Sequence, residues 1–267
     1  MKESIQLFRL DQFDKLKRDY DFITWWTETC IFKWILKKED IYVLKNKLNW
    51  KKLIYITALL PHFFEEKFYI FLKNLIGILW KNLEITINDW WIYYFLKNNW
   101  YLQDIKVNIG TNLYYHIKDP YTIFVKSEKN KFISIDSEFY NNFYSEFNKL
   151  DLHYPYHGLE IKYLDKFPKN IYYPYVQYSF TRACPWALYN AWETKSKLVL
   201  HCDGCPLDYY NKIVTQKLMI KGLNLKSYYV PNGQYYSIKE KFSIEDIINN
   251  INNEYITYNN FIVEENL

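Results

Sequence analysis

Two kinds of apolar pattern alternate along the chain. Short stretches rich in β-branched and aromatic residues are followed by longer stretches in which apolar residues recur every three or four positions. The short stretches are typical of strands, and the longer ones are typical of amphipathic helices. This alternation favours parallel strands in an α/β fold. Because eight strands are expected, the pattern predicts a single (β/α)8 TIM-like barrel, distorted where two connections are too short for a full helix.

The expected strands share β-branched and aromatic residues and end at polar or turn-forming positions. They cover residues 21–27, 53–60, 83–88, 104–109, 131–136, 159–163, 175–180 and 261–264. The Tyr-rich stretch from Tyr209 to Tyr236 is predicted to be irregular. No linker rich in Pro, Gly or Ser divides the chain, so residues 1–267 are predicted to form one domain.

The expected helices are located by their apolar stripes and by their capping residues. The clearest stripe consists of Phe64, Phe68, Phe71, Leu72, Leu75 and Leu79. Helices are also predicted over 39–48 and 90–97, the second of them capped by Asp89. Two more are expected to begin after a serine cap, Ser137 or Ser243. Their apolar faces are formed by Phe139, Phe143 and Phe147, and by Ile244, Ile247, Ile248 and Ile251.

The composition narrows the class of protein. Hydrophobic residues make up 49% of the chain and charged residues 24%, as in a globular protein. A net charge of +4 is too small to indicate nucleic acid or an anionic membrane as a partner. The polar start of the chain lacks the apolar run of a signal peptide, and charges interrupt the most apolar segment, 63–80, so no membrane span is expected. These features predict a cytoplasmic protein.

Three of the four cysteines, Cys184, Cys202 and Cys205, lie close together late in the chain. Two thiolates separated by two residues can bind one metal from a tight turn, for which Gly204 supplies the backbone freedom. Cys30 is the remaining thiol, so we expect the fold to bring it to the other three. In a chain without a secretory signal, reduced thiols favour metal ligation over disulfides. The residues alone leave open an iron–sulfur cluster, a structural zinc ion and four unligated thiols.

In a TIM-like barrel, chemistry takes place at the carboxyl ends of the strands. The residues expected at this mouth are Glu28, Cys30, Asn88, Asp89, Asn108, Gly110, Asp136, Arg182 and Cys184. Asp89 is either a helix cap or a carboxylate that transfers protons. Arg182 either holds an anionic substrate through two hydrogen bonds or forms an ion pair in the barrel wall. His153 and His157 flank Pro155, which favours a loop over a helical pair of metal ligands.

Several motifs, in this order, resemble the collagenase-like peptidase family of unassigned mechanism. They are a strand before Cys30, Glu84-Ile-Thr-Ile-Asn-Asp-Trp90, Asn108-Ile-Gly110 followed by Asp119-Pro120, Phe180-Thr-Arg-Ala-Cys184, and the Cys202/Cys205 pair. The chain looks most similar to the UbiU/UbiV iron–sulfur branch, which serves oxygen-independent ubiquinone synthesis. The resemblance spans residues 21–264 and is carried by pattern more than by identity.

The resemblance implies a TIM-like barrel that holds a [4Fe–4S] cluster through Cys30, Cys184, Cys202 and Cys205, and it favours this cluster over zinc. It further implies a part in oxygen-independent hydroxylation, or a related redox modification, of a small aromatic substrate such as a quinone precursor or of an RNA base. Asp89 and Arg182 are the candidate catalytic residues on the substrate side. The alternatives are a non-catalytic iron–sulfur partner in a heterodimer with a related family member, and a zinc-stapled binding module.

The chain also departs from the family pattern. Its last two cysteines are separated by two residues rather than three, and the Arg- and Gly-rich run before the cysteine of peptidase-like members is absent. Proteolysis is therefore not expected. The sequence contains no G-x-G-x-x-G, no P-loop, no H-E-x-x-H and no G-x-S-x-G, so nucleotide binding and serine hydrolysis have no support.

Overall fold

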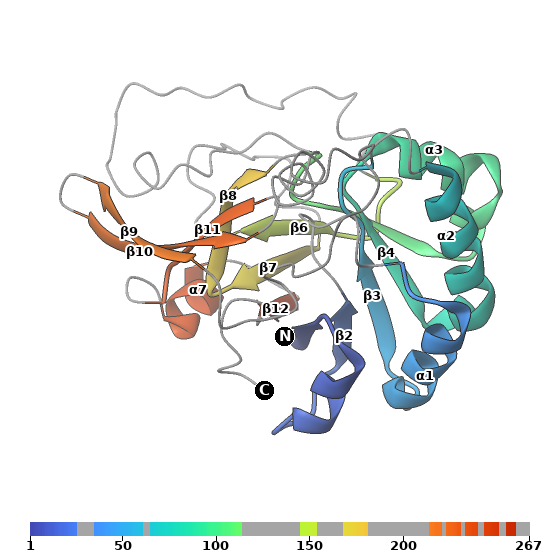
Figure 1. Cartoon of the computed structure of the whole chain (residues 1–267), viewed down its shortest axis with the longest axis horizontal. Coiled ribbons are helices and arrows are strands. Elements are labelled where there is room, and N and C mark those ends of the chain that lie inside the picture. The colour runs from blue at the N-terminus through green and yellow to red at the C-terminus, as the bar shows by residue number, and fades with distance from the viewer. Residues whose placement is uncertain are drawn as a thin grey trace, which may run out of the picture.

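In the computed structural model, eight parallel strands close into a barrel (Figure 1). They are β1 (Lys2–Leu7), β2 (Phe22–Trp25), β3 (Lys52–Ile56), β4 (Leu83–Ile87), β5 (Lys106–Ile109), β6 (Leu150–His153), β7 (Lys169–Tyr173) and β12 (Tyr255–Asn259). Their order is β1-β12-β7-β6-β5-β4-β3-β2, and β2 pairs with β1 to complete the ring. The structure describes residues 1–25, 35–60, 65–113, 145–153, 168–180, 214–220, 223–230, 233–239, 243–250 and 255–259. The predicted TIM-like α/β barrel is confirmed at the level of this closed parallel ring.

Three helices lie together on one side of the barrel (Figure 1). They are α1 (Lys38–Leu48), α2 (Glu65–Leu79) and α3 (Trp90–Asn98), and they match the predicted helices 39–48, 64–79 and 90–97 closely. Each connects two neighbouring strands between β2 and β5, as in a βα repeat. Short 3-10 helices lie in the described parts of the connections in this half: η1 (Leu10–Lys15), η3 (Trp80–Asn82) and η4 (Tyr101–Gln103). Among the helices that the structure describes, none has the length and apolar character needed to cross a bilayer.

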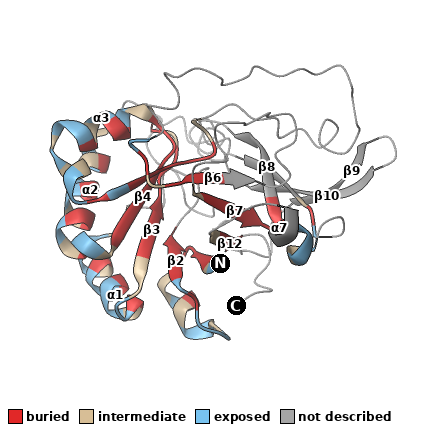
Figure 2. Cartoon of the chain, turned by 180° about the vertical axis from the view of Figure 1, so that it is seen from behind, coloured by how far each residue is buried: buried red, intermediate tan, exposed pale blue. Residues whose placement is uncertain are grey.

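The apolar core lies between the barrel wall and these helices. Figure 2 shows helices that are buried on one side and exposed on the other, around strands that are buried along most of their length. The predicted stripe of α2 is buried at Phe68, Phe71, Leu72, Leu75 and Leu79. Phe71 packs against Tyr55 of β3 with ring centroids 5.5 Å apart. Each large side chain buried in this way stabilises the fold by about 1.5–3 kcal/mol.

The predicted capping box is present at the start of α7 (Ile244–Asn250). The Ser243 backbone N–H donates to Asp246 Oδ2 at 2.9 Å, and the Asp246 N–H donates to Ser243 Oγ at 3.1 Å. The helix predicted after Ser137 lies mostly outside the described residues. Its described end, residues 145–149 with Phe147, is not helical.

A second sheet stands beside the barrel, on the side opposite α1–α3 (Figure 1). Its antiparallel strands are β8 (Tyr175–Phe180), β9 (Val214–Ile220), β10 (Leu223–Val230) and β11 (Gly233–Ser237), in the order β8-β11-β10-β9. Residues 175–180 thus form a strand, as predicted, but not a strand of the barrel. The prediction that 209–236 is irregular was wrong. The Lys-Gly and Pro-Asn-Gly sequences between these strands are hairpin signals that an expectation of βα units overlooks.

Several barrel strands differ from the prediction. β1, β6 and β7 are not predicted at all, and β12 ends before the predicted strand 261–264. His153 is the last residue of β6, so the loop predicted for this histidine was wrong. The predicted strands 131–136, 159–163 and 261–264 lie outside the described residues. The missed strands carry polar side chains at buried positions, which interrupts the continuous apolar run typical of a parallel strand.

Candidate functional site

The inside of the barrel is polar. Barrels of this type are generally filled by branched apolar side chains. Here the buried polar side chains on or next to the strands include Ser4, Thr24, Glu84, Thr86, Asn108, Lys149, Asp151, Asn170 and Thr257. A hydrogen bond between β4 and β6, which are not neighbours in the ring, crosses the interior. Burying polar groups costs free energy unless they are hydrogen-bonded, so an apolar interior would be the simpler way to stabilise a barrel. We therefore take this polar interior as the candidate functional site.

Asp151 on β6 is at the centre of this polar interior and is fully buried. Its Oδ2 accepts hydrogen bonds from Thr86 Oγ1 and from the Tyr172 hydroxyl, both at 2.8 Å. Its Oδ1 accepts a hydrogen bond from Asn170 Nδ2 at 3.0 Å. Asn170 Oδ1 in turn accepts one from Thr257 Oγ1 at 2.8 Å. Strands β4, β6, β7 and β12 therefore contribute to one hydrogen-bonded network.

Burial raises the pKa of Asp151 above its ordinary value of 3.8, because the carboxylate is removed from water. The positive charge of Lys149 and the three hydrogen bonds to the carboxylate act in the opposite direction and do not outweigh burial. Asp151 can therefore hold a proton at a higher pH than an ordinary aspartate. Buried groups perturbed in this way are frequent at functional sites.

A buried ion pair fills the amino-terminal end of the interior. Lys149 Nζ lies 2.9 Å from Glu84 Oε2, and the lysine side chain has no exposed surface. The same ammonium lies 4.3 Å from the ring centroid of Tyr255 and 5.4 Å from that of Phe22. Phe22 and Tyr255 are the first residues of β2 and β12. The ion pair and the two rings therefore occupy the amino-terminal end of the interior.

At the carboxyl end, Asn88 connects three neighbouring strand ends. Its backbone N–H donates to Thr57 Oγ1 at 2.9 Å, and its Nδ2 donates to the Thr57 carbonyl oxygen at 2.7 Å. Its Oδ1 accepts a hydrogen bond from the Asn112 N–H at 3.0 Å. Gly110 lies against this amide, and a Cβ at position 110 would come within 2.3 Å of Asn88 Oδ1. Because Gly110 has no side chain, the Asn88 amide can occupy the space beside it.

Asp89 caps α3, as predicted. Its Oδ1 accepts a hydrogen bond from the Trp91 N–H at 3.2 Å, and its Oδ2 accepts one from the Leu60 N–H at 3.0 Å. The side chain is buried, and its hydrogen bond to Leu60 is buried while that to Trp91 is partly buried. Asp89 therefore ties the start of α3 to the segment after β3. This geometry supports the structural interpretation of Asp89, and its role in proton transfer stays a prediction.

Replacing Asp89 by alanine is expected to lower the free energy of unfolding by about 2 kcal/mol, because one buried and one partly buried backbone amide lose their acceptor. Urea denaturation followed by circular dichroism measures this loss. Asp89→Asn keeps one acceptor oxygen and is expected to cost about half as much. The exposed Asp104→Ala is the control, with a change within about 0.5 kcal/mol. Equal stabilities of Asp89→Ala and Asp104→Ala would contradict the capping role.

The other predicted site residues lie outside the described residues. They are Cys30, Cys184, Cys202, Cys205 and Arg182, together with Glu28 and Asp136. The chain toward Cys30 is described as far as Trp25, at the carboxyl end of β2, and the chain toward Cys184 as far as Phe180, at the end of β8. Convergence of the four thiols stays a prediction. Among the residues that the structure describes, no group of three His, Cys, Asp or Glu side chains could bind a metal ion.

Sequence reasoning missed the network around Asp151. The signal available was alternation, because Leu150-Asp151-Leu152 and Asn170-Ile171-Tyr172 place polar and apolar side chains on opposite faces of a strand. In a parallel barrel this alternation indicates a polar interior and an apolar outer surface under helices. The strands concerned are four and five residues long, which is too short for alternation alone to identify them.

The fold and the site together define a closed parallel α/β barrel with a hydrogen-bonded carboxyl group at its centre. No family model, curated protein or solved structure matches the chain.

Proposed function

We propose that the protein is an iron–sulfur barrel enzyme that takes part in oxygen-independent hydroxylation, or a related redox modification, of an aromatic substrate bound at the carboxyl end of the barrel. The observation that supports the proposal best is the polar interior around Asp151, with donors from Thr86, Asn170 and Tyr172. Well-packed apolar groups in place of such a network are often neutral or stabilising. A polar interior therefore favours chemistry over a purely structural role.

The four cysteines suit a cluster as a donor set. Thiolates are soft ligands, which iron–sulfur clusters and zinc both prefer. In this proposal Cys30, Cys184, Cys202 and Cys205 hold a [4Fe–4S] cluster, which would supply one-electron transfer when bound. Support comes from β2, since it leads toward Cys30 from the carboxyl end of the ring, where barrel enzymes carry their chemistry.

Aromatic hydroxylation without O2 must also move protons. With water as the oxygen source, Ar–H and H2O give Ar–OH, two electrons and two protons, and a one-electron carrier protein must take up the electrons in turn. Asp151 is the described carboxyl group best placed to take up one proton. Tyr172, on the neighbouring strand β7, donates to it at 2.8 Å, and this hydroxyl can relay a proton to the carboxylate. Arg182 would hold an anionic group of the substrate.

Protein purified without oxygen is expected to be brown, with a broad visible absorption that bleaches on reduction and about four iron and four sulfide ions per chain. Cys202→Ser is expected to lower the iron content, whereas His201→Ala, its neighbour in the sequence, is the control that keeps it. Iron and sulfide assays with visible spectroscopy measure both variants. A colourless protein with one zinc ion per chain would contradict the cluster and would indicate a zinc-stapled binding module instead. A brown protein whose product formation is unchanged in Arg182→Ala would make it a partner subunit rather than the catalyst.

A further inference from the structure

Three tryptophans occupy equivalent places at the amino-terminal end of the barrel. Trp50, Trp80 and Trp100 follow α1, α2 and α3 and precede β3, β4 and β5. These strands are parallel neighbours in the ring, so the three connections lie side by side on one face. Packed helices are about 10 Å apart, so the three tryptophans, here called the tryptophan rim, span roughly 20 Å.

Backbone preference does not explain a tryptophan at any of these three positions, and burial does not explain Trp50 or Trp100. The φ angles are 72° at Trp50, 38° at Trp80 and 62° at Trp100, in the left-handed region that favours glycine. The residues are nevertheless exposed to 89%, 40% and 73%, respectively. A strained backbone that carries a large exposed apolar side chain gains little within one molecule. The rim therefore indicates a contact made with another molecule.

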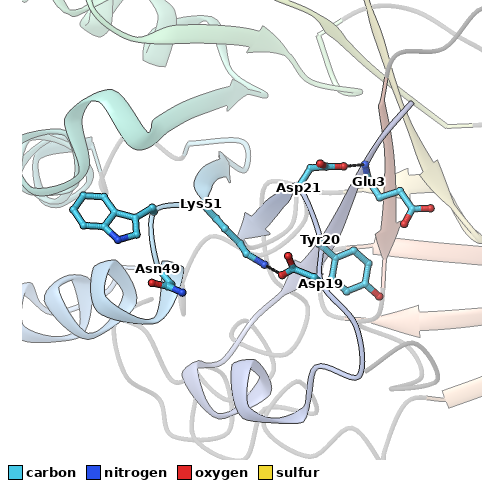
Figure 3. Close-up of a pocket in the computed structure, with 7 residues that line it drawn as sticks. Glu3, Asp19, Tyr20, Asp21, Asn49 and Lys51 are labelled. Carbon is cyan, nitrogen blue, oxygen red and sulfur yellow. Dashed lines mark hydrogen bonds and ion pairs between the residues drawn. The ribbon is translucent and has the colours of Figure 1, made fainter.

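A hollow of about 440 Å³ lies beside Trp50 on the same face. Figure 3 shows its lining, to which Trp50 itself contributes together with Glu3, Asp19, Tyr20, Asp21, Asn49 and Lys51. Asp19 pairs with Lys51, and Asp21 accepts a hydrogen bond from the Glu3 N–H at 2.8 Å. An indole ring has an apolar body and one N–H donor, so a wall that combines an aromatic ring with carboxylate and amide oxygens suits it.

A second copy of this chain is the partner that fits this face best. A two-fold interface is self-complementary, and a protruding anchor next to a hollow lets each copy insert its anchor into the other. The charges on the face have both signs and are paired, as in Lys47 with Asp14 and Lys51 with Asp19. Such a balanced surface complements itself better than it complements a nucleic acid or an anionic membrane.

The exposed area of the rim is sufficient to form the centre of an interface. The three exposed fractions together amount to about two complete tryptophans, or roughly 300–500 Å² at ~150–250 Å² each. A stable interface buries about 800 Å² per partner, so the rim supplies about half of it. The walls of the hollow and the neighbouring charged side chains would supply the remainder.

We propose that the protein forms a two-fold dimer through its amino-terminal face, with Trp50 of each copy in the hollow of the other and with Trp80 and Trp100 extending the contact. The carboxyl end of each barrel, where the proposed chemistry takes place, points away from this interface. The dimer does not depend on the proposed function, because it involves neither Asp151 nor the cysteines.

Sedimentation velocity over a range of protein concentrations tests the dimer. The wild type is expected to show a monomer–dimer equilibrium. Trp50→Gly is expected to weaken it by at least about 30-fold, the loss typical of an interface hot spot. The melting temperature of its monomer should stay equal or rise, because glycine adopts φ 72° without strain. Trp91→Ala is the matched control, since Trp91 is 57% exposed at the opposite end of the barrel and should leave the dimer intact.

A wild type that stays monomeric at every concentration would overturn the proposal, as would a dimer that survives Trp50→Gly. Equal loss of the dimer in Trp91→Ala would show that the rim is not its centre. The same proteins are mixed with vesicles of anionic phospholipid and with a single-stranded oligonucleotide. If a monomeric wild type binds one of these and Trp50→Gly does not, the rim belongs to that partner instead.

Discussion

Asp151→Ala is expected to lower the free energy of unfolding by about 4 kcal/mol. The substitution leaves the donors of Thr86, Asn170 and Tyr172 inside the barrel without their acceptor, and each such group costs about 1–3 kcal/mol. It also opens a small cavity. Asp151→Asn preserves the shape and one acceptor oxygen, so a loss of about 1–2 kcal/mol is expected. Denaturation in urea measures both variants, and a loss below about 1 kcal/mol in Asp151→Ala would show that the network contributes little.

A comparison of the wild type with Asp151→Asn tests the raised pKa of Asp151. Because burial raises this pKa in the folded state, the folded protein binds the proton more tightly than the unfolded chain does. The stabilisation from that proton is fully present below the ordinary pKa of 3.8 and is lost as the pH rises through the raised value. The stability of the wild type relative to Asp151→Asn should therefore fall as the pH rises from acid toward neutral.

Other acidic groups do not obscure this comparison. Asp11, paired with Arg9, has a lowered pKa, so its contribution is present above the ordinary value and is lost as the pH falls. It is the same in the wild type and in Asp151→Asn, so it cancels in the difference. A difference that is constant with pH, or that grows in favour of the wild type, would contradict the raised pKa.

Gly110→Ala is expected to lower the free energy of unfolding by about 3 kcal/mol. The new Cβ would lie 2.3 Å from Asn88 Oδ1 and 2.5 Å from its Cγ, which is closer than atoms can pack. The amide would have to move away from Thr57 and Asn112, and the ends of β3, β4 and β5 would lose their connection. Thermal or urea unfolding measures the loss.

Gly77→Ala is the matched control for this substitution. Gly77 lies inside α2, and a Cβ there would meet no atom within 4 Å. Alanine at a helix interior is therefore expected to stabilise the protein by about 0.5–1 kcal/mol. Opposite signs for the two glycines would assign the effect at position 110 to the contact with Asn88. A Gly110→Ala variant as stable as the wild type would show that the amide can relocate freely.

The half of the barrel that carries α1, α2 and α3 is predictable because its signals are local. The apolar stripe of α2 predicts this helix by itself. Asp89 predicts the start of α3, because it caps the helix through a hydrogen bond to Trp91, two residues away. Strands β3 and β4 are predicted for the same reason, since an apolar run or a strict alternation is visible within a few residues. Neither inference needs knowledge of distant partners.

The other half depends on pairing between distant segments. Residues 175–180 look like a strand in either sheet, and only their pairing with β11 (Gly233–Ser237) assigns them to the second one. Likewise, the polar positions Ser4, Asp151 and Asn170 make β1, β6 and β7 look like loops until the interior that they line is known.

The candidate site shows the same limit. Thr86 and Asp151 are 65 positions apart and Asn170 and Thr257 are 87 apart, so no spacing rule could have joined them. The cysteines were singled out because two thiols in one turn have a known ligand spacing. A buried carboxyl group inside a barrel has no such motif.

The pairing of β1 with β12 places Lys2 directly opposite Tyr255, although 255 − 2 = 253 positions separate them along the chain. On the ribosome, β1 therefore emerges long before this neighbour has been made. At a synthesis rate of about 5–20 residues per second, this edge stays open for on the order of 10 to 50 seconds. Unpaired strand edges are templates for wrong association, so the edge of β1 is at risk until β12 has been synthesised and pairs with it.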